Sequence, residues 1–177
     1  MCIFGVTMST AQTTEQLSLL SLVDLINYIE TNHHAYIRKT APLLIEYTEK
    51  MVRAHGDDHD EIKPLALCVR ELIDELMPHL MKEEQILFPA IKSLSLGQPA
   101  NGCFGHIGNP INMMLHEHDN ADQMLQSIRR LTNNYTIPAS VCHTWQACYR
   151  TLAEFDVDLQ NHINLENTLL FPKALVL

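Results

Sequence analysis

Apolar residues recur along most of the chain at the three- and four-residue spacing of amphipathic helices. The first such stretch begins after Ser21, a candidate N-cap. Pro42 lies inside this stretch and predicts a kink or a helix restart just before it. Residues 55–63 are polar and predict a loop. Pro64 suits the first position of a second helix, which is predicted to run to about Ile91.

The second half of the chain repeats this plan after a long connection. Residues 93–110 hold four glycines and two prolines, which predict an irregular crossover. A third helix is predicted from about Pro110 to Leu131. A turn over 132–139 follows, and Ser140 is the predicted N-cap of the fourth helix. Two helices per half predict an all-α, antiparallel four-helix bundle with an internal two-helix repeat.

One phrase, H-x3-E-x3-L-F-P, occurs in the second predicted helix and again in the fourth. His79 and Glu83 open the first copy, and His162 and Glu166 open the second, 83 positions later. Residues four apart share one helix face, and each pair lies in the apolar stripe that a bundle buries. An unpaired buried carboxylate is very costly, so each pair needs a partner. Metal binding explains the repetition better than two coincidental His–Glu hydrogen bonds.

Two single histidines extend the repeat. His34 precedes His79 by 45 positions, and His118 precedes His162 by 44. Each of the four predicted helices therefore contributes at least one candidate ligand to the interior, as in bundle proteins that hold a metal between their helices.

Polar residues close to these histidines are expected to play other roles. His33 is expected to lie outside the apolar stripe, and Glu117 is expected to be a surface charge. Asp158 and Glu30 each precede a candidate ligand histidine by one helical turn. These two acids are candidates for orienting an imidazole, with a surface position as the alternative.

The candidate ligands form a set of imidazoles and carboxylates without a thiolate. They are His34, His79, Glu83, His118, His162 and Glu166. This set suits iron or manganese better than copper(I), and it exceeds the four ligands of one structural zinc. Two metal ions that share both carboxylates would use all six residues. The deficit of negative charge favours an oxo or hydroxo bridge, and the open positions suit O2, NO or peroxide. A zinc protein and a metal-free bundle are the alternatives.

Composition narrows the class of protein. The 177 residues suffice for one domain, and the net charge of −9 argues against nucleic acid and anionic membranes as partners. Five cysteines without a C-x-x-C motif indicate a reducing compartment, which predicts a cytoplasmic location. No apolar run approaches the roughly 18 residues of a membrane span. Residues 1–20 are expected to form a flexible extension before a bundle over 21–177, and Met8 is an alternative start.

These motifs together resemble the hemerythrin-like family, and more specifically the RIC (repair of iron centres) di-iron proteins. The resemblance spans roughly residues 22–175. It rests on the two long phrases and on Glu117-His118-Asp119, Thr132-Asn133-Asn134 and Thr144-Trp145. It implies two iron ions bound by the six candidate ligands, with both glutamates bridging. The oxygen-carrier branch of the family uses a fifth histidine and a different spacing before its second carboxylate.

The resemblance also implies a function in stress. A RIC protein helps to restore iron–sulfur clusters damaged by nitric oxide or oxidants, by supplying iron from a labile di-iron site, so damaged iron–sulfur proteins are the expected partners. Direct chemistry on NO is also attributed to the family, which leaves an NO-reducing enzyme or an O2- or NO-binding sensor as the alternative. Many members carry an N-terminal domain with paired cysteines. Here about 20 residues precede the first predicted helix and Cys2 is alone, so the resemblance does not extend to steps that use those cysteines.

Overall fold

The structure, a computed structural model, consists of long helical segments and describes residues 14–99 and 105–177. A short helix, α1 (Thr14–Ser18), comes first. The first long segment joins α2 (Leu22–Tyr28), a π-helical turn η1 (Ile29–His34) and α3 (Ala35–His55). The second joins α4 (Ile62–Lys82), a π-helical turn η2 (Glu83–Leu87) and α5 (Phe88–Ser95). The third is α6 (Gly108–Leu131), and the fourth joins α7 (His143–Leu165), a π-helical turn η3 (Glu166–Leu170) and α8 (Phe171–Ala174).

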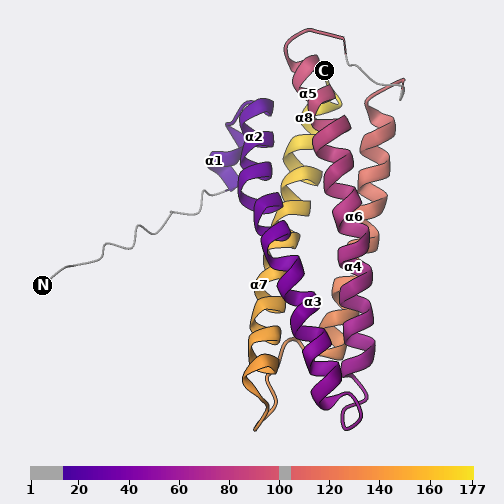
Figure 1. Cartoon of the computed structure of the whole chain (residues 1–177). Helices are drawn as coiled ribbons and strands as arrows, with labels where there is room; N and C mark the ends of the chain where they lie inside the picture. The colour runs from indigo at the N-terminus through magenta and orange to yellow at the C-terminus, as the bar shows by residue number, and fades with distance from the viewer. Residues whose placement is uncertain (1–13, 100–104) are drawn as a thin grey trace, which may run out of the picture.

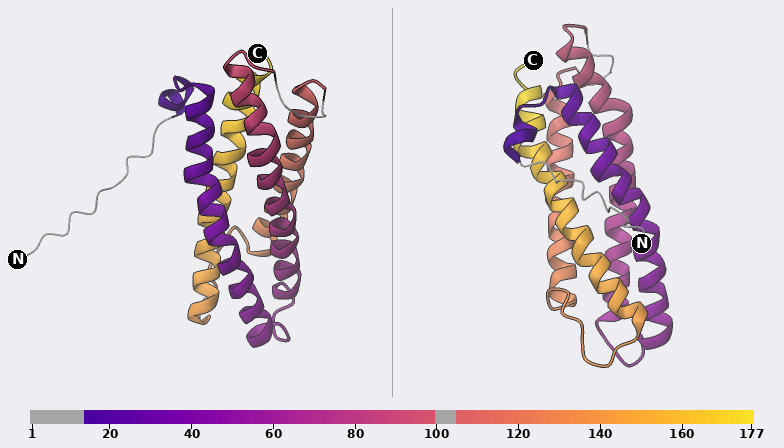
Figure 2. Two further views of the ribbon diagram at one scale, coloured as in Figure 1. Left: turned by 45° about the horizontal axis from the view of Figure 1, so that its top comes forward. Right: turned by 90° about the vertical axis from the view of Figure 1, so that its left-hand side faces the viewer.

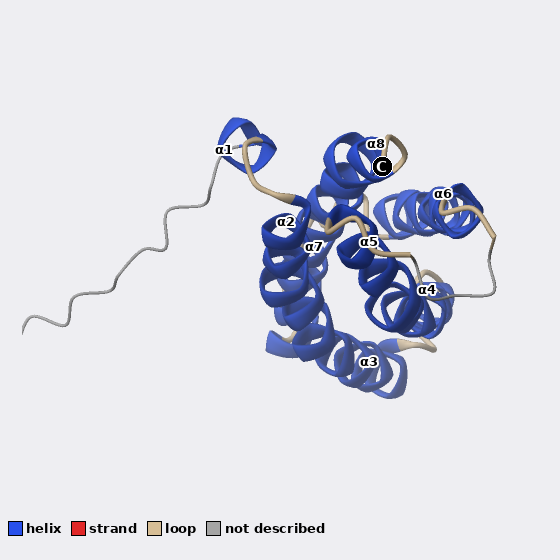
Figure 3. Ribbon diagram, turned by 90° about the horizontal axis from the view of Figure 1, so that it is seen from above, coloured by secondary structure: helices blue, strands red, loops and turns tan. Residues whose placement is uncertain are grey.

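These four segments run side by side, each antiparallel to the one before it in the chain (Figures 1 and 2). Viewed from above, they surround one axis, and α1 lies outside the ring they form (Figure 3). The predicted all-α bundle is therefore confirmed. Within the described residues, no helix has the length and apolar character needed to cross a membrane.

The predicted helix ends hold only in part. Pro64 was expected at the first position of the second helix, but α4 begins two residues earlier, at Ile62. The Ser21 hydroxyl oxygen accepts a hydrogen bond from the backbone N–H of Asp24 at 3.1 Å, which confirms the predicted N-cap. Of the kink or restart predicted before Pro42, the restart was wrong, because α3 continues through this residue. The N-cap predicted at Ser140 was also wrong. Ser140 has a φ of 65°, and helix α7 begins three residues later with Cys142 as its N-cap.

The turn between α6 and α7 is held by a polar contact between the two helices. Arg129 donates two hydrogen bonds to the Asp156 carboxylate, at 2.6 and 2.5 Å, and the Tyr135 hydroxyl donates a third at 2.6 Å. Asn133 and Asn134 have positive φ values of 47° and 53°, which asparagine tolerates better than most residues. The contact holds the start of α7 against the end of α6. It therefore helps to set the position of the ligand residues of α7 along the bundle axis.

The interior is divided into two apolar clusters. The larger, which we call the lower core, lies between α3, α4, α6 and α7, and includes Leu44, Leu72, Leu125, Trp145 and Phe155. The smaller, the upper core, lies around α2, α5 and α8, and includes Leu25, Phe88, Ile111, Leu165 and Phe171. Along the long segments, the residues of the lower core and those of the upper core occupy different parts of the helices. The buried polar residues form a layer between the two clusters.

Helix α1 packs onto the upper core. Leu17 of α1 is buried there, and Lys173 donates hydrogen bonds to the carbonyl oxygens of Ser18 and Leu20 at 2.7 and 3.2 Å. Residues 1–13, which include Met8 and most of the predicted extension, lie outside the described residues.

Candidate metal centre

Each π-helical turn begins or ends at a candidate ligand. Two of them start at Glu83 and Glu166, and the third ends at His34. In the turns that start at Glu83 and Glu166, the backbone hydrogen bond spans five residues instead of the usual four. The N–H of Phe88 donates to the carbonyl of Glu83, and the N–H of Phe171 donates to the carbonyl of Glu166. A π-turn is rare and widens the helix by one residue locally, and such turns are frequent at functional sites.

The structure brings all six candidate ligands together in two groups. One group contains His34, Glu83, His162 and Glu166, and the other contains His79, Glu83, His118 and Glu166. Within each group the donor atoms lie within 4.8 Å of one another. Both carboxylates belong to both groups, which is the arrangement that two metal ions sharing bridging carboxylates would require. We call the first group position 1 and the second group position 2.

The spacing of the imidazole nitrogens fits metal ligation. The Nε2 atoms of His34 and His162 are 3.2 Å apart, and those of His79 and His118 are also 3.2 Å apart. Two nitrogens bound at about 2.1 Å to one ion and at right angles lie roughly 3 Å apart. Each pair of imidazoles is therefore spaced like two neighbouring ligands of a single ion.

The two carboxylates have no hydrogen-bond donor among the described residues, and only imidazoles lie close to them. Glu83 and Glu166 are both 0% exposed. The four Nε2 atoms lie 3.1–3.5 Å from their oxygens, yet none of these oxygens accepts a hydrogen bond from the described residues. Two buried carboxylates without donors are very costly. A pair of cations between the carboxylates and the Nε2 atoms would remove that cost, so the residues present fit a di-iron centre.

The charges of this layer shift the pKa values of its members in a consistent direction. Burial lowers the pKa of His79, but the attraction of Glu83, Glu166 and Glu117 together outweighs burial and raises the pKa to about 9. The pKa values of His34 and His118 are raised as well, since the attraction of Glu83 and Glu166 outweighs burial. Burial acts to raise the pKa of Glu166, but the imidazoles of His162 and His118 hold it well below its usual value. Without metal, the carboxylates therefore retain charge, and the imidazoles of His34, His79 and His118 attract protons.

Comparison with known proteins agrees with this geometry. Residues 25–174 match the family described as the hemerythrin HHE cation-binding domain. The chain belongs to this family. It is 44% identical over 154 residues to the iron-sulfur cluster repair protein YtfE of Musicola paradisiaca, and 42% identical to the proteins of that name from Yersinia pseudotuberculosis and Escherichia coli O157:H7. The alignments cover 87% of this chain and 66% of each relative, so the chain spans about two thirds of their length. The family resemblance drawn from the motifs is confirmed.

Three of the four histidines of this hemerythrin-type site have an outer hydrogen-bond acceptor. The Nδ1 atoms of His34, His79 and His118 each lie 2.8 Å from a side-chain oxygen, of Glu84, Glu117 and Asn167 respectively. With Nδ1 as the donor, Nε2 presents its lone pair to the centre, as a metal-bound histidine requires. Salt bridges hold both acids, because Arg38 pairs with Glu84 at 2.6 Å and Lys82 pairs with Glu117.

The direct hydrogen-bond acceptors of the imidazoles differ from the predicted residues. Glu117 is not a free surface charge, because it accepts a hydrogen bond from His79. Glu30 pairs with Lys92 at 3.3 Å and Asp158 with His33 at 2.9 Å, so neither contacts a ligand histidine. The observed acceptors each lie next to a ligand in the sequence, which is the signal that could have identified them.

His33 was predicted to lie outside the bundle and instead lies inside it. It is 7% exposed, and its ring stacks on that of His162 with centroids 5.9 Å apart. The π-turn that ends at His34 explains the error, because a widened turn allows two consecutive residues to face inward.

The Phe of the repeated phrase packs against the single histidine of the same half. Phe88 stacks on His34 with ring centroids 5.6 Å apart, and Phe171 stacks on His118 at 5.9 Å. Each Phe covers its imidazole on the side that faces the upper core. This shared packing role accounts for the same sequence spacing between the Phe and the His–Glu pair in both halves.

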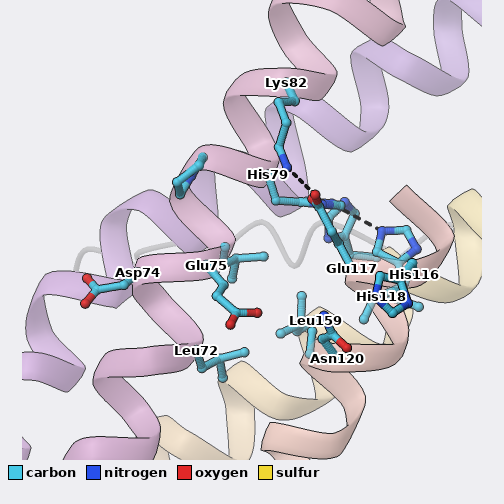
Figure 4. Close-up of a pocket in the computed structure, with 15 residues that line it drawn as sticks. Leu72, Asp74, Glu75, His79, Lys82, His116, Glu117, His118, Asn120 and Leu159 are labelled. Atoms are coloured by element: carbon cyan, nitrogen blue, oxygen red, sulfur yellow. Dashed lines mark hydrogen bonds and ion pairs between the residues drawn. The ribbon is translucent and has the colours of Figure 1, made fainter. Parts of the chain in front are cut away.

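A pocket of about 440 Å³ leads to position 2 from the surface between α4 and α6. Its lining includes His79, His118 and His162, with Lys82 and Glu117 joined by their salt bridge beside it (Figure 4). Glu75, which is exposed, points into the pocket from α4 (Figure 4). His116 lies at the edge of the pocket and is exposed, as predicted. The pocket therefore reaches both imidazoles of position 2 and one imidazole of position 1 from solvent.

Proposed function

We propose that the chain holds two iron ions, with His34 and His162 bound to one, His79 and His118 to the other, and Glu83 and Glu166 bridging them. The observation that carries this proposal is the sharing of two fully buried, unpartnered carboxylates by two pairs of imidazole nitrogens. The name of the similar proteins, iron-sulfur cluster repair protein, supports iron over zinc or manganese. An oxo or hydroxo bridge would complete the charge balance.

We further propose that this centre serves the repair of iron–sulfur clusters damaged by nitrosative or oxidative stress, with iron as the cargo it donates. The partners would be damaged iron–sulfur proteins in the cytoplasm. Similar proteins carry the repair activity in their name, and the pocket gives a route between position 2 and solvent. The acidic chain, with a net charge of −9, suits the transport of cations better than the binding of nucleic acid.

The residues of the centre are suited to exchanging protons for metal. The bound state requires neutral imidazoles and ionised carboxylates. When an ion leaves, the raised pKa of His79, about 9, allows this imidazole to take a proton from solvent at neutral pH. The resulting imidazolium faces Glu83 at 3.4 Å and compensates the buried carboxylate. Release therefore leaves Glu83 beside a positively charged imidazolium, which lowers the free-energy cost of giving up the ion.

The pocket also supports a second candidate function, the binding or reduction of NO or O2. Bound iron supplies the redox chemistry for such a reaction. The chain's own residues contribute an apolar wall, from Leu72, Leu76 and Leu159, which favours an uncharged diatomic molecule. The charged rim formed by Lys82 and Glu117 is equally compatible with passage of an ion.

One comparison separates the two functions. The iron-loaded, reduced protein is incubated without oxygen with a damaged aconitase-type cluster protein, and separately with NO. Recovery of the cluster together with loss of iron from this chain is expected. The production of N2O over many turnovers with iron retained would instead establish the enzyme. Glu166→Gln should abolish either activity, whereas Glu46→Gln, at an exposed salt bridge far along α3, should change neither.

A further inference from the structure

The outer contacts of the centre follow the internal repeat of the chain. Glu84 follows the ligand Glu83 and accepts from His34, and Asn167 follows the ligand Glu166 and accepts from His118. These two contacts occupy equivalent places in the two halves. The remaining two histidines, His79 and His162, should then also have equivalent acceptors.

At that second pair of places the two halves differ. Glu117 precedes the ligand His118 and accepts a hydrogen bond from His79. The equivalent residue in the first half precedes His34 and is His33. Its ring stacks on His162 with an interplanar angle of 17°. Neither His162 Nδ1 nor His33 Nε2 has a hydrogen-bond partner among the described residues, so His162 has no direct counterpart to Glu117.

Three buried polar atoms around this stack have no partner among the described residues. They are Nδ1 of His162, Nε2 of His33 and Oδ2 of Asp158. The side chains adjoin one another, since His33 stacks on His162 and its Nδ1 lies 2.9 Å from Oδ1 of Asp158. Asp158 also lies one turn before His162 on α7. Leaving three such atoms unpaired in one place would be costly.

We propose that His33 is a positioning residue for the ligand His162, and that together with Asp158 it binds one buried water which accepts the hydrogen bond of His162 Nδ1. One water has the required valences. It accepts from the His162 N–H, donates to the Asp158 oxygen and donates to the His33 Nε2 lone pair. This inference rests on the metal centre proposed above and extends it to the fourth outer contact.

The proposed contact makes the two metal positions different. In position 2 both imidazoles are held by direct hydrogen bonds, to Glu117 and Asn167. In position 1 one imidazole, His34, is held directly by Glu84, and the other is held only through water. An outer contact of a ligand histidine typically changes metal affinity 10–100-fold. The loss of His33 is therefore expected to act on position 1 alone.

The test uses the protein loaded with Co²⁺, whose unpaired electrons shift the ring N–H signals of bound histidines far from the rest of the proton NMR spectrum. Four such exchangeable signals are expected, one for each ligand histidine. His33→Phe keeps the stacked ring and removes both nitrogens. It is expected to move the His162 signal and to speed its exchange with water about tenfold. Chelators should then remove one of the two ions about tenfold faster.

Matched variants distinguish positioning from a general loosening of the fold. Glu117→Gln, at the equivalent place in the other half, should move the His79 signal and leave that of His162 unchanged. Asp158→Asn should reproduce the effect of His33→Phe, and it serves as the second variant if His33→Phe does not fold. His33→Gln, whose amide oxygen can accept directly, should retain a slowly exchanging His162 signal.

Two results would overturn the proposal. The first is a set of four unchanged signals in His33→Phe and Asp158→Asn, and the second is an equal shift of all four. The measurement uses no cluster protein, so a failed repair assay leaves it standing. An unmodified protein that binds no cobalt would overturn the metal centre and this contact together.

Discussion

Removing the metal should make the stability of the protein depend on pH between about 6.5 and 9. In the metal-free protein, burial lowers the pKa of His79, but Glu83, with smaller contributions from Glu166 and Glu117, raises it from 6.5 to about 9. A group whose pKa is raised by folding stabilises the protein fully below its unfolded pKa and loses this contribution as the pH rises through its folded pKa. The metal-free protein is therefore expected to weaken as the pH increases across this window.

The size of the effect follows from the shift. One pKa unit corresponds to about 1.36 kcal/mol, so His79 alone contributes roughly 3 kcal/mol at pH 6.5 that is absent at pH 9.5. His34 and His118 are shifted in the same direction and add to it. For a chain of 177 residues, roughly 3 kcal/mol corresponds to a change in Tm of about 10 °C.

Urea denaturation of the metal-free and iron-loaded proteins at pH 6.5, 8 and 9.5 measures the effect. Iron keeps the imidazoles deprotonated at every pH, so the loaded protein should change little. Glu83→Gln removes the charge that raises the pKa of His79, and its metal-free form should show a smaller dependence. Equal midpoints for the metal-free protein at pH 6.5 and 9.5 would refute the reasoning, as would a parallel decline of the loaded protein.

Further predictions concern single side chains. Glu166→Gln should reduce bound iron well below two per chain, measured by metal analysis after desalting, because both positions share this carboxylate. Glu117→Gln should weaken one of the two iron-binding steps 10–100-fold in a competition titration with a chelator, through loss of the charged acceptor of His79. Tyr135→Phe should lower the free energy of unfolding by about 1–2 kcal/mol in urea, because it removes one hydrogen bond to the Asp156 carboxylate. Phe88→Ala should lower it by about 3–5 kcal/mol, since the ring is fully buried and stacked on a ligand histidine.

The bundle and the meeting of the six ligand residues followed from periodicity. Apolar spacing determined which face of each helix is buried, and the i, i+4 relation placed each His and Glu on that face. The register of His118 on α6 and its exposed neighbour His116 were read correctly for the same reason.

The error at His33 arose where the helix departs from its regular period. A π-turn changes the direction of the residues it contains, so a regular wheel put His33 outside although it is buried. Such turns depend on tertiary packing rather than local propensity. The outer contacts of Glu84 and Glu117 were missed because they join different helices, and no single-helix pattern reports them.

The polar layer between the two cores also influences which part of the protein unfolds first. The lower and upper cores each bury their own apolar side chains, and the ligand residues lie between them. Once the ions are gone, this layer contributes less to holding the two ends together, and the smaller end, with α2, α5 and α8, is expected to open at a lower free energy than the whole. Its backbone would then become accessible to proteases. The lifetime of the polypeptide would thus depend on how much iron is still bound, and copies that have lost their iron would be degraded first.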